Sequence, residues 1–223
     1  DFDLEAVAAD AREKGVALIG HQETGGNIPA YEAEMEAAFA QYERLGVHAV
    51  KTGYAGEIIP KGQHHHGQWM INHYQSVVEK AAAHRIALDV HEPIKFTGLS
   101  RTWPNLMTGE GVLGTEYEAW SDGNPPEHTT ILPFTRGLGG PMDYTPGIFA
   151  TTFSNRPGNR VHTTVAKQLA LYVVLFSPLQ MAADLPENYE GRPEFQCIRD
   201  VPTTWDETRV LDAEIGDFVV IAR

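Results

Sequence analysis

The stretch QWMINHYQSVVEKAAAHRIALDVHEP, residues 68 to 93, joins a helical pattern directly to a short apolar run. Apolar residues recur at the three- and four-residue spacing of an amphipathic helix, whose inward face is expected to hold Met70, Tyr74, Val77, Val78 and Ala81. The run that follows, IALDV at 86–90, is almost entirely apolar, as in parallel strands that are covered on both faces. The stretch therefore predicts a helix, a short turn and a buried strand.

The same unit occurs twice earlier in the chain. Residues 4–15 have helical spacing behind an N-cap candidate at Asp3 and lead into the run VALIG at 16–20. Residues 31–46 form a second helical pattern that ends at a glycine and is followed by VHAVKTG at 47–53. Three consecutive helix–strand units with short turns predict a parallel α/β fold, and the (β/α)8 barrel is its leading form.

Each of the three predicted strands ends in polar side chains: His21 and Glu23, then Lys51 and Tyr54, then Asp89, His91 and Glu92. The carboxyl ends of parallel strands meet at one edge of a sheet or one mouth of a barrel, where active sites are found. We therefore expect Glu23, Lys51 and Glu92 to be neighbours in space. The alternative is that each strand ends in polar residues only because it leaves the core there.

The segment 93–149 has a different character. It is rich in glycine and proline, carries Glu110 and Glu116, and contains no helical period longer than about two turns. Long irregular segments inside compact domains are usually functional or disordered. The aromatic residues of the segment supply apolar burial, so an ordered and functional excursion is predicted.

The pattern resumes with a helix from about Val165 to Val173, a break at Pro178 and a short apolar strand after it. Residues 208–223 then predict a β-hairpin that turns near Gly216. The sequence thus predicts about six of the eight strands of a barrel. We expect a partial (β/α)8 barrel over residues 1–205, with its first strands missing, and the start of an antiparallel β-domain at 206–223.

Composition excludes several functions. With 42% hydrophobic and 21% charged residues, the 223-residue chain is that of an ordinary globular protein rather than a disordered one. A formal charge of −13 disfavours nucleic acid and anionic membranes as partners. No run of 18 apolar residues occurs, so membrane insertion is not expected. The single cysteine, Cys197, excludes an internal disulfide and is expected to be a small buried apolar group.

Long motifs at matching spacings make the chain similar to the catalytic barrel of glycoside hydrolase family 97, and within it to the inverting, calcium-dependent α-glucosidases. The motifs are GHQETGGN (20–27), VKTGYAGEIIPKGQHHHGQWM (50–70), HEPIKFTGLSRTWPNLMTGEGVLGTEYEAW (91–120), HTTILPFTRGLGGPMDYTPGIF (128–149) and QLALYVVLFSPLQMAADLPENY (168–189). The resemblance covers roughly the middle third of such an enzyme. It implies that missing N- and C-terminal parts complete the fold, that maltooligosaccharides are the substrates, and that the protein is periplasmic or exported in a Gram-negative bacterium.

The resemblance also implies the roles of individual residues. Glu116 matches the general acid, and Glu92 and Glu23 match the pair of carboxylates that activate the water. Glu92, Glu110 and Glu116 match ligands of a calcium ion. His21, Lys51 and His91 match residues that contact the sugar. Inverting hydrolysis requires a protonated carboxyl on the leaving oxygen and a carboxylate on a water at the opposite face, about 6.5–9.5 Å away, and calcium prefers such oxygen ligands.

Two alternatives remain at the level of the sequence. Retaining members of the family carry an aspartate nucleophile at the place of Thr52 or Gly53, so a retaining α-galactosidase-type enzyme would need another aspartate, for which Asp89 is the candidate near a strand end. A non-catalytic carbohydrate-binding fragment is the second alternative. The histidines at 64–66 are expected to belong to a substrate-lining loop rather than to a zinc site, and Glu118 is expected to be a solvated surface residue.

Overall fold

The computed structural model describes residues 3–223, which form two compact units. The first unit ends at Gly111, and the second runs from Val112 to Arg223. Each unit packs around its own apolar cluster. Among the residues described, no helix has both the length and the apolar character needed to cross a membrane.

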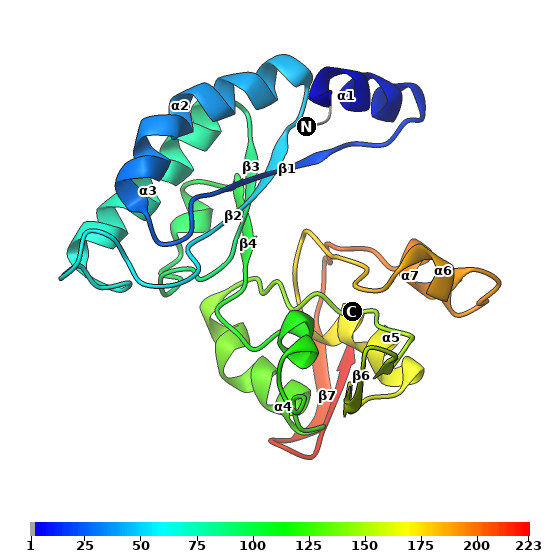
Figure 1. Ribbon diagram of the computed structural model, residues 1–223. Helices are drawn as coiled ribbons and strands as arrows, with labels where there is room; N and C mark the ends of the chain where they lie inside the picture. Colours follow the sequence, from blue (N-terminus) through cyan, green and yellow to red (C-terminus); the bar gives the residue numbers. More distant parts are fainter. Residues whose placement is uncertain (1–2) are drawn as a thin grey trace. The chain divides into compact units, whose positions relative to one another are not determined.

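The first unit is built on a sheet of four parallel strands that are ordered as they occur along the chain (Figure 1). The strands are β1 (Ile19–Glu23), β2 (Ala49–Gly53), β3 (Ala87–Val90) and β4 (Leu106–Gly109). The helices are α1 (Leu4–Glu13), α2 (Ile28–Leu45) and α3 (Gln68–Ala83), followed by the short η1 (Leu99–Arg101). The predicted parallel α/β fold is therefore confirmed. The described residues do not form a closed eight-stranded barrel, so the barrel remains a prediction.

Local sequence explains the ends of the helices. The side chain of Asp3 accepts a hydrogen bond from Ala6 N at 3.0 Å and caps α1, as predicted. Asn27 caps α2 in the same way through Ala30 N. Helix α2 ends at Gly46, whose φ of 72° is the left-handed conformation that glycine adopts without strain. The first strand begins later than predicted, at Ile19.

The two faces of the sheet differ in chemistry because side chains alternate along each strand. One face carries Val50, Leu88 and Leu106, which are at most 2% exposed and pack with α2 and α3 in a single core. The helices contribute Tyr31, Met35, Phe39, Met70, Tyr74, Val77, Val78 and Ala81 to that core. Figure 1 shows both helices on the same side of the sheet. The inward face predicted for residues 68–83 is thus confirmed.

The other face of the sheet is polar. The strand register places His21 beside Lys51, Lys51 beside Asp89, and Asp89 beside Thr108. Glu23 is level with Gly53 on the same face. A row of titratable side chains therefore crosses three strands on the face that α2 and α3 leave uncovered.

The second unit consists of short elements. They are η2 (Thr115–Ala119), α4 (His128–Ile131), η3 (Leu132–Phe134), η4 (Arg136–Gly139), β5 (Thr152–Phe153), β6 (Arg156–Arg160), α5 (Val165–Val174), α6 (Pro186–Tyr189), α7 (Phe195–Asp200), β7 (Arg209–Glu214) and β8 (Phe218–Ala222). Its core gathers Leu132, Met142, Tyr144, Leu171 and Leu175. The predicted helix α5 and the hairpin β7–β8 with its turn at Gly216 are confirmed. The division into domains at residue 205 remains a prediction.

Three predictions about local structure were wrong. The segment 93–149 contains a strand, β4, which is only four residues long and therefore too short to show a clear period. Residues 179–185, directly after Pro178, form no strand, because Ala183 N instead bonds to Pro146 O and Met181 O accepts the Tyr172 hydroxyl. Cys197 is exposed, since it lies on the short surface helix α7.

Candidate active site

The carboxylates of Glu23 and Glu92 lie at the carboxyl end of the sheet and face a common point above Gly53. A Cβ atom placed on Gly53 would lie 2.9 Å from Glu92 Oε2 and 3.1 Å from Glu23 Oε2. The two oxygens are therefore within about 6 Å of each other. The expectation that these two side chains are spatial neighbours is confirmed. A water molecule between them would meet two proton acceptors at once.

Thr52 and Gly53 point to opposite faces of the sheet. The hydroxyl of Thr52 is fully buried and lies 2.8 Å from the Tyr31 hydroxyl on α2. A side chain at position 53 would instead enter the polar face, where Glu23 and Glu92 already lie. Of the two positions considered from the sequence, only residue 53 is thus placed to supply a side chain to the site.

Glu92 has an unusual backbone conformation. Its φ is 43°, in the left-handed region, although it is not a glycine and it precedes Pro93. Such a conformation costs about 1–3 kcal/mol and persists only when surrounding contacts enforce it. Its Oε2 accepts a hydrogen bond from Tyr54 N at 2.8 Å, and its own N–H donates to Glu110 Oε2 at 3.4 Å. Glu110, 18 residues further along the chain, is therefore brought to Glu92 as predicted.

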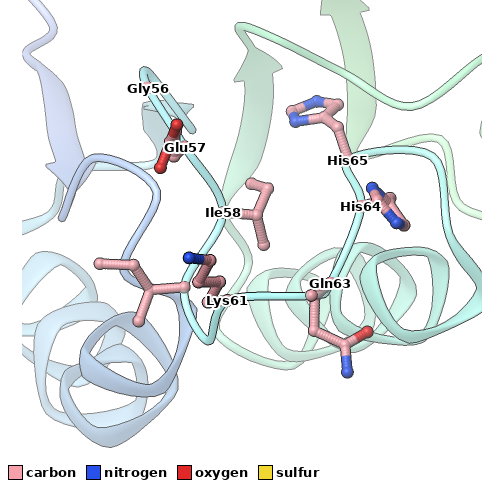
Figure 2. A pocket seen from close by; sticks show the side chains of 9 residues that line it. Gly56, Glu57, Ile58, Lys61, Gln63, His64 and His65 are labelled. Atoms are coloured by element: carbon pink, nitrogen blue, oxygen red, sulfur yellow. The ribbon is translucent and has the colours of Figure 1, made fainter.

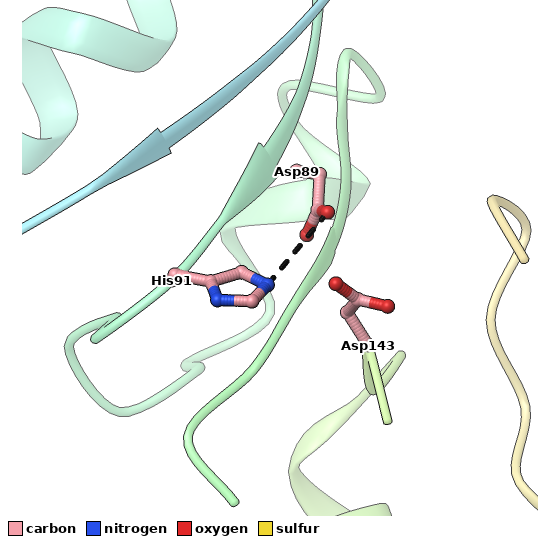
Figure 3. A group of neighbouring side chains, drawn as sticks. All are labelled: Asp89, His91 and Asp143. Carbon is pink, nitrogen blue, oxygen red and sulfur yellow. Dashed lines mark ion pairs between the residues drawn. The ribbon is translucent and has the colours of Figure 1, made fainter. Parts of the chain in front are cut away.

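His91 lies between two carboxylates and is 5% exposed. Its Nδ1 is 3.6 Å from Glu110 Oε1, and its Nε2 is 4.0 Å from Asp89 Oδ2. Figure 3 shows the contact between Asp89 and His91. Asp89 is 1% exposed and belongs to strand β3 rather than to the loop after it. A buried aspartate beside a histidine is suited to orienting that ring.

His21 and Lys51 extend the polar row on the neighbouring strands. His21 Nε2 lies 3.0 Å from Glu23 Oε2, which ties the exposed imidazole to one of the paired carboxylates. Lys51 is partly buried between His21 and Asp89 in the register of the sheet. All the site residues predicted from the sequence, except Glu116, are thus gathered at one end of the first unit.

Glu116 belongs to the second unit, on the short helix η2. The turn before it is fixed because Thr115 N donates to Tyr144 O at 3.0 Å and Gly114 packs against the same carbonyl. Its side chain is exposed. The structure therefore shows a well-anchored backbone at Glu116, and the roles assigned to it from the sequence remain predictions.

Glu118 was expected to be solvated, and that prediction was wrong. It is 2% exposed and accepts a hydrogen bond from Asn124 N at 2.9 Å. A 3-10 helix has three residues per turn, so residues two apart point to different sides, and Glu118 points inward where Glu116 points outward. Burial raises the pKa of the Glu118 carboxyl, while Asn124 and His162 partly oppose that rise.

The loop between β2 and α3 forms a pocket beside the site. Its volume is about 460 Å³, and its lining consists of Gly56, Glu57, Ile58, Ile59, Lys61, Gly62, Gln63, His64 and His65 (Figure 2). His65 Nε2 also forms a hydrogen bond to the backbone carbonyl of Glu92. Sequence reasoning did not find this contact. The run of three histidines was the available signal, and only their spatial arrangement distinguishes His65 from its neighbours.

The chain is similar to known proteins over its whole length. The family model described as glycoside hydrolase 97 matches residues 1–112. The retaining α-galactosidase of Bacteroides thetaiotaomicron is 33% identical over 233 residues, which cover 100% of this chain and 33% of the relative. Structures of a family 97 enzyme from Pseudoalteromonas sp. strain K8, one with panose and one with acarbose, are 49% and 50% identical with TM-scores of 0.93. Each match covers 99% of this chain and 36% of that enzyme.

A parallel α/β sheet with paired carboxylates at its carboxyl end is an arrangement found in sugar-hydrolysing enzymes. With half of its length matched by the family model, the chain belongs to glycoside hydrolase family 97. It spans about a third of the length of the relatives that it matches.

Proposed function

We propose that the protein containing this chain is an inverting, exo-acting α-glucosidase that hydrolyses α-glucosidic bonds of starch-derived oligosaccharides. The observation that carries the proposal is the space above Gly53. A retaining enzyme needs a nucleophilic carboxylate within reach of the anomeric carbon. Here Gly53 supplies no side chain, and the carboxylates of Glu23 and Glu92 converge on that space. Two adjacent carboxylates without a nucleophile on that strand suit the activation of water.

The proposed reaction divides the work between the acidic residues. Glu92 and Glu23 hold the attacking water and accept its proton as it adds to the anomeric carbon. Glu116 donates a proton to the leaving oxygen, so that no charged alkoxide has to depart. His21, Lys51 and His91 are proposed to bind the hydroxyl groups of the sugar. The hydrogen bond from Tyr54 N to Glu92 Oε2 holds the carboxylate in place.

Calcium is the proposed cofactor, with Glu92, Glu110 and Glu116 as ligands. The donor set fits the ion, because carboxylate oxygens are what calcium prefers. Glu92 and Glu110 are held close together by the contact from Glu92 N to Glu110 Oε2. When bound, calcium would offset the repulsion among these carboxylates and polarise nearby oxygens. The side chains, and not the ion, would orient the water and transfer the protons.

The glucosidase proposal is supported by the identity to a family 97 enzyme crystallised with oligosaccharides, whereas the curated relatives are named retaining α-galactosidases. Identity to the enzyme crystallised with panose and acarbose is 49–50%, against 33% to the retaining α-galactosidase. The structures with oligosaccharides also support an oligosaccharide as the substrate. We further propose that the full protein completes a (β/α)8 barrel, with the start of a β-domain at 206–223, and acts in the periplasm or outside the cell of a Gram-negative bacterium.

The stereochemistry of the product tests the proposed mechanism directly. Proton NMR of a fresh digest of 4-nitrophenyl α-glucoside by the full-length enzyme should show the β-anomer of glucose before mutarotation produces the α-anomer. Inversion turns an α-linkage into a β-product in a single displacement. Initial release of the α-anomer would contradict the inverting mechanism.

A retaining α-galactosidase is the second candidate, and the observation favouring it is the 33% identity to such an enzyme over the whole chain. It predicts faster hydrolysis of 4-nitrophenyl α-galactoside than of the corresponding α-glucoside, with the α-anomer released first. Rates on the two substrates under identical conditions separate the candidates. No hydrolysis of either glycoside would contradict both.

Removal of calcium is expected to lower maltose hydrolysis about tenfold or more, because Glu92 and Glu110 would repel each other without the ion. The measurement is the initial rate after treatment with a calcium chelator, followed by addition of calcium or magnesium. Calcium should restore the rate better than magnesium, which requires a more regular octahedral site. A rate indifferent to chelation would overturn the ligand assignment.

A further inference from the structure

The strained backbone of Glu92 requires contacts that hold it. Because Pro93 follows and φ is 43°, the free peptide would favour an extended conformation at this residue. Two of the holding contacts come from residues already placed in the site or next to it, namely Glu110 Oε2 and Tyr54 N. The third comes from His65, which belongs to the loop between β2 and α3.

His65 contacts the backbone carbonyl of Glu92, which neither Glu110 nor Tyr54 contacts. Its Nε2 bonds to the carbonyl oxygen of Glu92, and a carbonyl can only accept, so Nε2 carries the proton and donates. The partner atom lies on the C-terminal side of the strained residue, whereas Glu110 holds the N–H on the other side. Together the two contacts fix both peptide planes that flank Glu92.

The ring of His65 is itself held in position. It meets the ring of Tyr54 edge to face, with centroids 6.3 Å apart, and Tyr54 is 1% exposed. Tyr54 is anchored further by rings on α2 and α3, through Tyr31 and His73. The core therefore holds the ring of His65 in position, and His65 in turn holds the backbone of Glu92. Figure 2 shows the ring at the edge of the loop pocket, above His64.

We propose that His65 is a positioning residue that holds Glu92 in its left-handed conformation and thereby aims its carboxylate at the space above Gly53. This rests on the proposed function, in which Glu92 holds the attacking water. Without the hydrogen bond from His65, the peptide after Glu92 is free to rotate towards the extended conformation. The carboxylate then leaves its place beside Glu23.

The test compares three variants of the full-length enzyme. His65→Leu removes the donor while keeping most of the volume, and it is expected to lower kcat for maltose about 10²-fold, as for a shift of about 1 Å in a reacting group. KM should change less than about twofold, because the sugar contacts remain. His65→Gln retains an N–H donor at a similar reach and should recover most of kcat. His48→Leu is the matched control and should keep the wild-type rate, because His48 is exposed, lies before strand β2, also contacts a backbone carbonyl, that of Arg85, and has no role in the site.

A structural readout keeps the test independent of hydrolysis. Crystal structures of the His65→Leu and His65→Gln enzymes should show φ of Glu92 outside the left-handed region in the first and inside it in the second. Glu92 unmoved in His65→Leu would overturn the proposal, as would equal loss of kcat in both variants together with lower thermal stability. If the wild-type enzyme hydrolyses no glycoside, the proposed function fails, and the conformation of Glu92 still decides this proposal.

Discussion

The Glu116→Gln enzyme is expected to hydrolyse maltose about 10³-fold more slowly than the wild type, a loss typical of removing a general acid. The amide has nearly the same shape as the carboxyl but cannot give up a proton to the departing oxygen. The backbone of Glu116 is fixed through Thr115 N and Tyr144 O, so the substitution should leave the local structure unchanged. The measurement is the initial rate of glucose release by the full-length enzyme.

A substrate whose leaving group needs no proton provides the control for the role of Glu116 as the general acid. The 4-nitrophenolate anion departs without being protonated, so 4-nitrophenyl α-glucoside should suffer a much smaller loss in the variant than maltose. Glu127→Gln is the matched control variant, since Glu127 is an exposed glutamate of the same unit with no role in the proposal. An unchanged rate on maltose in Glu116→Gln would remove Glu116 from the role of acid.

The same variant tests the hypothesis that the chain is a non-catalytic carbohydrate-binding fragment. Calorimetry with the Glu116→Gln enzyme should show that maltose still binds, because the amide retains hydrogen-bonding groups at the same place. Binding that survives while hydrolysis is lost separates recognition from catalysis. Absence of hydrolysis in the wild type, with binding intact, would instead favour the binding fragment.

The parallel sheet could be predicted because three helix–strand units repeat the same apolar pattern. Met70, Tyr74 and Val77 recur at helical spacing, and their burial against the sheet follows from it. Strand β4 could not be predicted in this way, since four residues that end in Thr108 and Gly109 carry too little apolar signal. Its pairing with β3 depends on a long-range contact that a local pattern does not contain.

The site could be predicted in composition but not in detail. Strand ends identified Glu23 and Glu92 as neighbours, and the geometry above Gly53 confirms it. Alternation along β2, visible only once the faces are known, decides that residue 53 and not residue 52 enters the site. The burial of Glu118 depends on the phase of a 3-10 turn, and the role proposed for His65 depends on a loop conformation. Neither the phase of this turn nor the conformation of the loop produces a periodic pattern in the sequence.

At Gly53 the proposed mechanism is sensitive to a single added atom. The Gly53→Ala enzyme is expected to hydrolyse maltose about 10²-fold more slowly, because the methyl group would come within 2.9 Å of Glu92 Oε2 and 3.1 Å of Glu23 Oε2. Backbone strain is not the cause, since Gly53 lies in strand β2 and does not have a positive φ. Initial rates and the thermal midpoint of the full-length enzyme distinguish displaced carboxylates from loss of fold.

Gly53→Asp should be slower still, and it should not convert the enzyme to retention. An aspartate side chain would have to displace the Glu23 and Glu92 carboxylates and would add a third negative charge beside them, which raises the free energy of the ionised site. Thr52→Ser is the matched control: its hydroxyl can still bond to Tyr31 on the opposite face, so the wild-type rate is expected. If Gly53→Asp instead released α-glucose first from 4-nitrophenyl α-glucoside at an undiminished rate, the space above residue 53 would already be shaped for a nucleophile. The chain would then be a retaining enzyme that lacks one side chain, and the pairing of Glu23 with Glu92 would have to be explained by something other than a shared water.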